Sequence, residues 1–126
     1  DAQLFAPQTS WHPFPRALTC ADIDARLHVS KAMLAHGSAK GAFAATYRMR
    51  NGTTIDVLAK RPIEASRFRR KAQNETYMVD VMKREARILQ NLHSLQHVMR
   101  YYGGCHRSMR AAVNVVERLE RFTSVL

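Results

Sequence analysis

The sequence contains few cysteines, few acidic residues and no long apolar run. Only Cys20 and Cys105 occur in 126 residues, and they lack the CxxC spacing of most structural zinc sites. No apolar run approaches the roughly 20 residues that a membrane-spanning helix needs. The sequence therefore favours neither a zinc domain nor a transmembrane segment.

The two cysteines leave two interpretations open. They form one disulfide if the protein is lumenal, or they are two inert buried thiols. Two glycosylation sequons, Asn51-Gly52-Thr53 and Asn74-Glu75-Thr76, weakly favour a secretory or extracellular location over a cytoplasmic one.

Acidic residues are half as numerous as basic ones, 10 against 20, which gives a formal net charge of +10. Such a charge suits an anionic partner, such as nucleic acid, an acidic surface or a nucleotide. The densest basic cluster, Arg67 to Lys71, has no aromatic residues interleaved as stacking platforms. We therefore expect a solvated helix face there and no specific nucleic-acid partner.

The composition, 46% hydrophobic and 24% charged, is that of one folded domain or part of one. The first residue is Asp, so we expect these residues to belong to a longer protein. We divide the chain into an N-terminal arm, residues 1–31, and a folded unit, residues 32–126. The arm contains a short predicted helix from about Cys20 to Leu27, with Thr19 as its N-cap.

Residues 32–61 are predicted to form three strands. Small residues from Ala35 to Gly41 separate the first two strands, and Asn51-Gly52 predicts a type I′ hairpin turn before the third. From Thr53 to Lys60 the residues alternate between two faces, and Pro62 ends the strand.

A long helix follows, with apolar residues at spacings of three and four. This stripe consists of Met78, Val81, Met82, Glu85, Ile88, Leu89 and Leu92. Two further strands are expected, Val98 to Tyr102 and Ala111 to Val116, separated by a break at Gly103-Gly104. The predicted class is α+β, a five-stranded antiparallel sheet with one long helix.

Glu85 is the unexpected member of the helical stripe. A carboxylate on a buried helix face is costly unless it is paired. Lys60, at the end of a core-facing strand, is the obvious partner. A narrower stripe, with Glu85 at its boundary, is the alternative.

These residues together resemble the N-terminal lobe of eukaryotic protein kinases, over residues 32–126. The family's strand lysine motif is matched by Val57-Leu58-Ala59-Lys60, and its helix glutamate by Glu85. The pattern that follows the helix in the family is matched by Leu92, His97, Val98, Met99, Tyr102 and Gly103. Val115 to Leu119 is similar to the fifth strand and the hinge.

The resemblance implies ATP binding and phosphoryl transfer to a protein or glycan hydroxyl. Lys60 is then expected to hold the phosphates and Glu85 to hold Lys60. The remaining nucleotide-binding residues implied by the match are Ala35, Gly37, Ser38, Lys40, Ala42, Leu58, Val116, Glu117 and Leu119. The chain has no His-Arg-Asp or Asp-Phe-Gly, so the catalytic base and the Mg²⁺ ligands are expected in a C-terminal lobe outside it.

Three departures from the family pattern bear on activity. Only Gly37 remains of the three loop glycines, Ala42 replaces the usual valine, and Leu58 replaces the usual alanine. The basic Lys40 at the third glycine, with Leu18 to Ile23 upstream, is similar to divergent secretory-pathway kinases such as the protein O-mannose kinase and vertebrate lonesome kinase groups. The alternatives are a pseudokinase scaffold and a basic, non-catalytic nucleic-acid-binding module.

Overall fold

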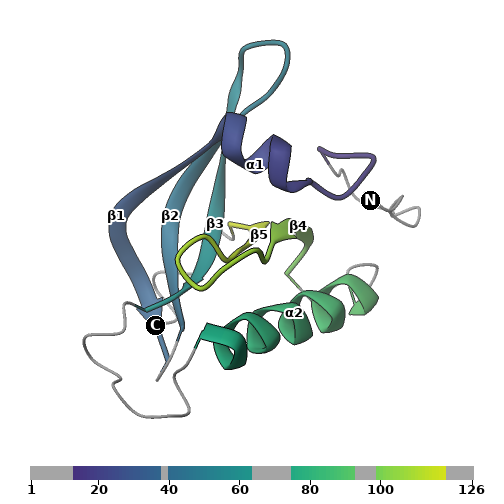
Figure 1. Ribbon diagram of the computed structural model, residues 1–126. Helices are drawn as coiled ribbons and strands as arrows, with labels where there is room; N and C mark the ends of the chain where they lie inside the picture. The colour runs from purple at the N-terminus through teal and green to yellow at the C-terminus, as the bar shows by residue number, and fades with distance from the viewer. Residues whose placement is uncertain (1–12, 38–39, 64–74, 93–98, 119–126) are drawn as a thin grey trace.

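The part of the chain that the structure describes is α+β, with five antiparallel strands and two helices (Figure 1). The computed structural model describes residues 13–37, 40–63, 75–92 and 99–118. In chain order the elements are α1 (Cys20–Arg26), β1 (Leu27–His36), β2 (Lys40–Arg48), β3 (Thr54–Pro62), α2 (Glu75–Leu92), β4 (Tyr101–Cys105) and β5 (Val113–Glu117). The five strands and the long helix are confirmed, although β1 begins at Leu27, ahead of the expected Ala32.

The strand order is β1-β2-β3-β5-β4, so the last strand in the sequence lies between β3 and β4. The register places Lys60 of β3 opposite Asn114 of β5, and Leu58 opposite Val116. Directly opposed residues in adjacent strands project from the same face of a sheet. Lys60 and Asn114 therefore share one face.

Helix α1 begins with a reciprocal capping box. The Thr19 hydroxyl accepts a hydrogen bond from the Asp22 amide at 3.2 Å, and the Asp22 carboxylate accepts from the Thr19 amide at 3.0 Å. Together these bonds satisfy backbone donors that a helix start otherwise leaves unpaired. The prediction of Thr19 as N-cap is confirmed.

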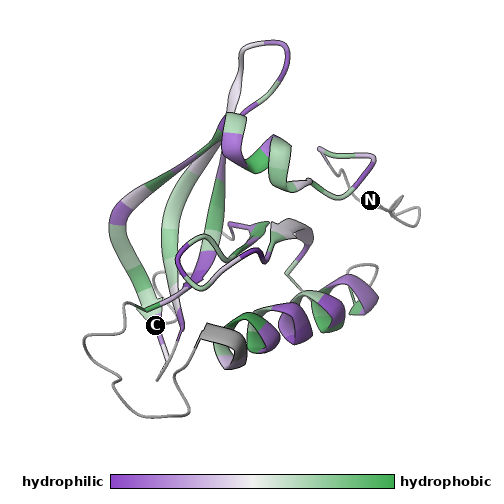
Figure 2. Ribbon diagram, viewed as in Figure 1, coloured by the Kyte–Doolittle hydropathy of each residue, from purple (hydrophilic) through white to green (hydrophobic). Residues whose placement is uncertain are grey.

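The sheet has an apolar core on each face, as the alternation in β3 predicts. Val57 and Ala59 pack with Ile23 of α1 and with Phe14 in one cluster. Leu58 packs with Ala86 of α2 in the other. Figure 1 shows β4 and β5 between the two helices, and Figure 2 shows hydrophobic and hydrophilic bands along α2. The second cluster places α2 over the face that carries Lys60.

The buried stripe of α2 is narrower than the sequence predicts. Met78, Met82 and Ala86 are buried, whereas Ile88 is 54% exposed and Leu92 36% exposed. Met78, Met82 and Ala86 are four residues apart and lie along one side of the helix, and Leu89 packs partly buried against the cluster that contains Ala86, whereas Ile88 and Leu92 lie outside this contact. The prediction that Ile88 and Leu92 belong to the buried face was wrong.

The β2–β3 hairpin is present, but its turn is not type I′. That turn requires positive φ at two central residues, and among the described residues only glycines have positive φ. Here Gly52 has φ +93°, its amide donates to the Met49 carbonyl at 3.0 Å, and the Asn51 side chain accepts from the Thr53 amide at 3.0 Å. The Asn51 side chain thus stabilises a longer loop without left-handed backbone at its own position.

Gly103-Gly104 lies within β4, so the predicted break there was wrong. The sheet tolerates the pair because the β4–β5 register shifts between Tyr101 and Gly103. Gly103 has φ +152°, and a Cβ at this position would meet the Leu18 amide nitrogen and lie 2.6 Å from the Leu18 carbonyl oxygen. The close approach of the two backbones therefore requires glycine.

Gly103→Ala should lower the free energy of unfolding by at least about 2 kcal/mol, because both backbone strain and a backbone clash oppose the methyl group. Gly52→Ala is the matched control, since Gly52 also has positive φ but a Cβ added there would have nothing within 4 Å. We expect the control to lose about 1 kcal/mol. Urea unfolding of both variants measures the difference, and equal losses would contradict the role of the Leu18 contact.

A disulfide joins Cys20 of α1 to Cys105 of β4. The two cysteines are therefore paired and are not free thiols. An exposed ion pair between Asp24 and Arg107, at 2.8 Å, links α1 to the segment after β4. Neither described helix is long and apolar enough to cross a membrane.

Candidate functional site

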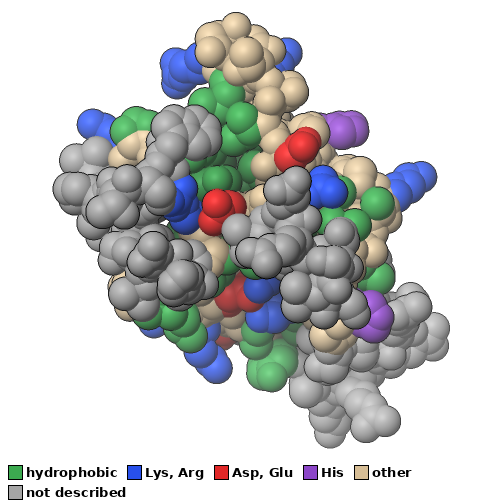
Figure 3. Space-filling model, turned by 180° about the vertical axis from the view of Figure 1, so that it is seen from behind, with side chains coloured by type: hydrophobic (Ala, Val, Ile, Leu, Met, Phe, Trp, Pro, Cys, Tyr) green, Lys and Arg blue, Asp and Glu red, His purple; other side chains and the backbone are tan. Residues whose placement is uncertain are grey.

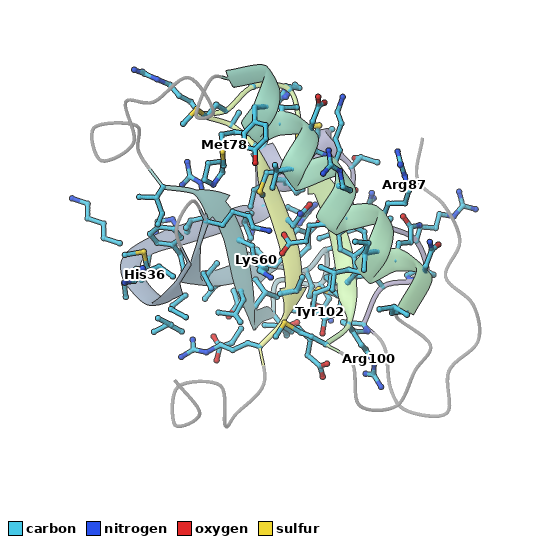
Figure 4. All side chains as sticks on the ribbon, turned by 90° about the horizontal axis from the view of Figure 1, so that it is seen from below. His36, Lys60, Met78, Arg87, Arg100 and Tyr102 are labelled. Carbon is cyan, nitrogen blue, oxygen red and sulfur yellow. A yellow bond between two sulfur atoms is a disulfide. The ribbon has the colours of Figure 1, made fainter. Side chains whose placement is uncertain are left out.

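The centre of the site is an ion pair between β3 and α2. Lys60 Nζ lies 2.6 Å from Glu85 Oε2, and the Glu85 side chain is only 14% exposed. Figure 4 shows Lys60 pointing from the sheet toward α2. The alternation of β3 aims Lys60 at α2, so the pairing expected from the sequence is present.

A second lysine shares the same carboxylate oxygen. Lys40 Nζ, at the start of β2, lies 3.2 Å from Glu85 Oε2. Two cations thus converge on one acid, which leaves an excess positive charge. Lys40 was expected at the nucleotide, but its contact with Glu85 was not foreseen from the sequence. Figure 3 shows basic and acidic side chains next to one another on the molecule seen from behind.

The other Glu85 oxygen is held from β5. Asn114 Nδ2 donates to Glu85 Oε1 at 3.0 Å and to the Met82 carbonyl oxygen at 3.0 Å. Asn114 Oδ1 in turn lies 2.6 Å from His106 Nε2. The carboxylate is therefore fixed on both sides, by lysines at one oxygen and by an amide at the other.

These contacts determine the ionisation of Glu85. Burial by itself raises the pKa of Glu85, but hydrogen bonds from Lys60 and Asn114 and the charges of Lys60 and Lys40 outweigh it, so the pKa lies below its ordinary value. Nearby, burial and the charge of Glu85 together raise the pKa of Tyr101 to about 12. At neutral pH, Glu85 is thus ionised and Tyr101 is neutral.

A cavity of about 480 Å³ opens beside the ion pair. Its size is within the usual range for small-molecule sites. The lining consists of Ala35, His36, Gly37, Lys40, Gly41, Ala42, Lys60, Tyr77, Val81 and Glu85. The structure thus brings Ala35, Gly37, Lys40, Ala42, Lys60 and Glu85 together, which are six of the residues predicted from the sequence.

The predicted adenine-contacting residues are placed differently. Leu58 and Val116 are fully buried in the apolar cluster beneath α2, and neither lines the cavity. Ala42 belongs both to that cluster and to the cavity wall. The Glu117 amide donates to the Arg100 carbonyl at 2.8 Å, so this N–H is already engaged. Ser38 and Leu119 lie outside the described residues.

Asn114 and His106 were not identified as site residues from the sequence. Asn114 could have been identified from the sequence. It is a single amide within the apolar run Ala111–Val116, as Glu85 is a single acid within the apolar stripe of the helix. His106 gave no comparable signal, since it follows β4 in an irregular segment. Within the described ranges, no group of three or more His, Cys, Asp or Glu side chains could hold a metal ion.

No protein-family model matches the chain, and no curated protein sequence matches it significantly. The function must therefore be argued from the geometry of the site.

Proposed function

We propose that this chain is the nucleotide-binding N-terminal lobe of a protein kinase. The observation that carries the proposal is the 2.6 Å ion pair between Lys60 of β3 and Glu85 of α2, on one face of a five-stranded antiparallel sheet. In protein kinases a strand lysine paired with a helix glutamate positions the phosphates of ATP.

The charge of the cavity supports a polyphosphate ligand. Lys40 and Lys60 both line it, and Glu85 is the only acid among its described lining residues. Glu85 keeps both lysines close to the cavity while offsetting only part of their charge. A triphosphate would supply the anionic oxygens that such a pair of ammonium groups binds.

Ala42 is the residue that supports binding of the adenine ring. Because Ala42 lines the cavity and also touches the cluster of Leu58 and Val116, an adenine ring entering from the cavity would meet apolar side chains. The full burial of Leu58 and Val116 is the observation that favours the second candidate, a pseudokinase scaffold. In that case the lobe binds partners without turnover.

In the reaction we propose, an acceptor hydroxyl oxygen of a protein or glycan attacks the γ-phosphorus of ATP. The bond to the β–γ bridging oxygen breaks, ADP leaves and the hydroxyl proton passes to a general base. The proposal requires a C-terminal lobe to supply that base and the Mg²⁺ ligands, because residues 1–126 contain no His-Arg-Asp or Asp-Phe-Gly. Lys60 and Lys40 would hold the phosphates, and Glu85 would orient Lys60.

The Cys20–Cys105 disulfide supports a secretory-pathway location for this kinase. Structural disulfides persist in oxidising compartments and are rare in the cytosol. The exposed Asn51 of the first sequon, in the β2–β3 turn, is accessible to glycosylation as such a location would require. The disulfide and this sequon support the proposed similarity to the divergent secretory-pathway kinases.

NMR titration of the full chain with the non-hydrolysable analogue AMP-PNP and Mg²⁺ tests nucleotide binding. We expect saturable amide shifts at Gly37, Ala42 and Lys60, with smaller shifts for AMP because it lacks the outer phosphates. Absence of shifts at millimolar analogue would overturn the proposal. Tight, steeply salt-dependent binding to single-stranded RNA would instead support the nucleic-acid-binding alternative.

A further inference from the structure

Asn114 is fully buried, with 0% exposure, and apart from the tyrosines it is the only polar side chain among the described residues that is buried. A buried amide is retained at low cost only when its donors and acceptor are all used. Its two donor contacts are the Glu85 carboxylate and the Met82 carbonyl, and its acceptor contact is His106. Asn114 thus connects β5 both to the backbone of α2 and to its central acid.

The chemistry of the partners fixes the orientation of the carboxamide. The Met82 carbonyl and the Glu85 carboxylate are acceptors, so the amide nitrogen of Asn114 must face them. Asn114 Oδ1 then faces His106, and the Nε2 atom of His106 must carry a proton to donate across the 2.6 Å separation. The hydrogen bond from His106 therefore disfavours the flipped orientation of the Asn114 carboxamide, in which Nδ2 would no longer donate to Glu85.

Gly104 provides the space for this arrangement. It lies opposite Asn114 in the β4–β5 register. A Cβ on Gly104 would lie 2.6 Å from Asn114 Oδ1 and 3.0 Å from His106 Nε2. The missing side chain thus leaves room for the hydrogen bond that orients Asn114.

We infer that Asn114 is a positioning residue for Glu85, and that His106 and Gly104 hold its carboxamide in place. Asn114 fixes Oε1 of Glu85, which leaves Oε2 directed at Lys60 and Lys40. Without this bond only the lysine contacts at Oε2 hold the carboxylate, so its orientation toward Lys60 and Lys40 is less tightly fixed. An effect of Asn114 on nucleotide binding depends on the proposed function, whereas its effect on the position of the Glu85 carboxylate does not.

The first test is the titration of Glu85, followed by the ¹³C resonance of its side-chain carboxyl group in the full chain. Asn114→Leu conserves volume but removes the donor, and should raise the titration midpoint by about one pH unit, a tenfold change in the proton equilibrium. The charged and titratable groups around Glu85, namely Lys40, Lys60, Tyr101 and His106, are unchanged in this variant. An unchanged midpoint would overturn the inference, whether or not the chain binds nucleotide.

The second test is a double-mutant cycle on AMP-PNP affinity with Glu85→Gln. If Asn114 acts through Glu85, Asn114→Leu should weaken binding about tenfold in the wild-type background and very little in the Glu85→Gln background. Equal losses in both backgrounds would show a purely structural role and overturn the inference. Absence of nucleotide binding by the wild-type chain, together with a shifted Glu85 titration, would overturn the proposed function alone.

A second set of variants applies if Asn114→Leu does not fold. His106→Phe removes the donor to Asn114, whereas His106→Gln provides another N–H donor. Gly104→Ala replaces no polar group, but its methyl group would press on the Asn114 carboxamide and would also lie 2.9 Å from the Tyr101 hydroxyl oxygen. We expect His106→Phe and Gly104→Ala to raise the Glu85 midpoint and His106→Gln to restore most of the wild-type value. Identical midpoints in all three variants would overturn the role of His106 and Gly104.

Discussion

Lys60→Met is expected to reduce phosphoryl transfer by the complete protein at least about a hundredfold, while leaving the fold intact. The loss follows because the proposed role of Lys60 is electrostatic, and removing one preorganised donor from a reacting group typically costs this much. The fold should survive because methionine keeps the apolar stem and Glu85 retains its contacts with Lys40 and Asn114. Transfer of ³²P from γ-labelled ATP to acceptor or to the protein itself measures the effect.

Lys40→Met is the matched control, since it removes a lysine from the same carboxylate oxygen at the longer distance of 3.2 Å. We expect a smaller loss, about tenfold, because Lys60 still holds Glu85 and the phosphates. Unchanged transfer in Lys60→Met would contradict the proposed role of Lys60. A larger loss in Lys40→Met than in Lys60→Met would assign the main phosphate contact to β2.

Removing the disulfide should produce the second large effect, on stability. Cys20 and Cys105 are 85 residues apart, so the bond closes a long loop and restricts the unfolded chain strongly. For the double variant Cys20→Ser/Cys105→Ser we expect a loss of about 4 kcal/mol in the free energy of unfolding and a fall of about 15 °C in the melting temperature. Thermal unfolding followed by circular dichroism measures both.

Asp24→Asn provides the control for the disulfide. It breaks an exposed ion pair with Arg107 that joins α1 to the segment after β4, close to the disulfide. Exposed pairs contribute at most about 1 kcal/mol, so the melting temperature should fall by only a few degrees. A double cysteine variant no less stable than this control would show that the disulfide does not stabilise the fold.

The sequence predicted most of the sheet because hydrophobic alternation and helical spacing are local signals. The two faces of β3 follow directly from such a pattern, and Thr19 was predicted as an N-cap from its residue type. Glu85 was predictable in the same way, since an acid within an apolar stripe must find a cation. The lysine that ends a core-facing strand was the natural choice.

What could not be predicted depends on contacts between distant segments. The type of the Asn51-Gly52 turn depends on a side-chain hydrogen bond that competes with the usual backbone preference. Gly103-Gly104 indicates a break when only its neighbours in the sequence are considered, yet it lies in a strand because both glycines pair with β5, and the close approach of Leu18 requires glycine at position 103. The exposure of Ile88 depends on how much of α2 the sheet covers, and periodicity alone does not contain that information.

The strand order also has a consequence for synthesis of the chain. Because β5 lies between β3 and β4, neither β4 nor the β3 edge from Val57 to Lys60 has its sheet partner until residues 113–117 have left the ribosome. An unpaired apolar edge is the feature that most favours wrong intermolecular pairing in a nascent protein. Asn114 arrives with the same strand, so the amide contact to Glu85 forms only when the sheet closes. Truncation before residue 113 should therefore yield a chain that chaperones retain, and the site would be assembled in a single late step.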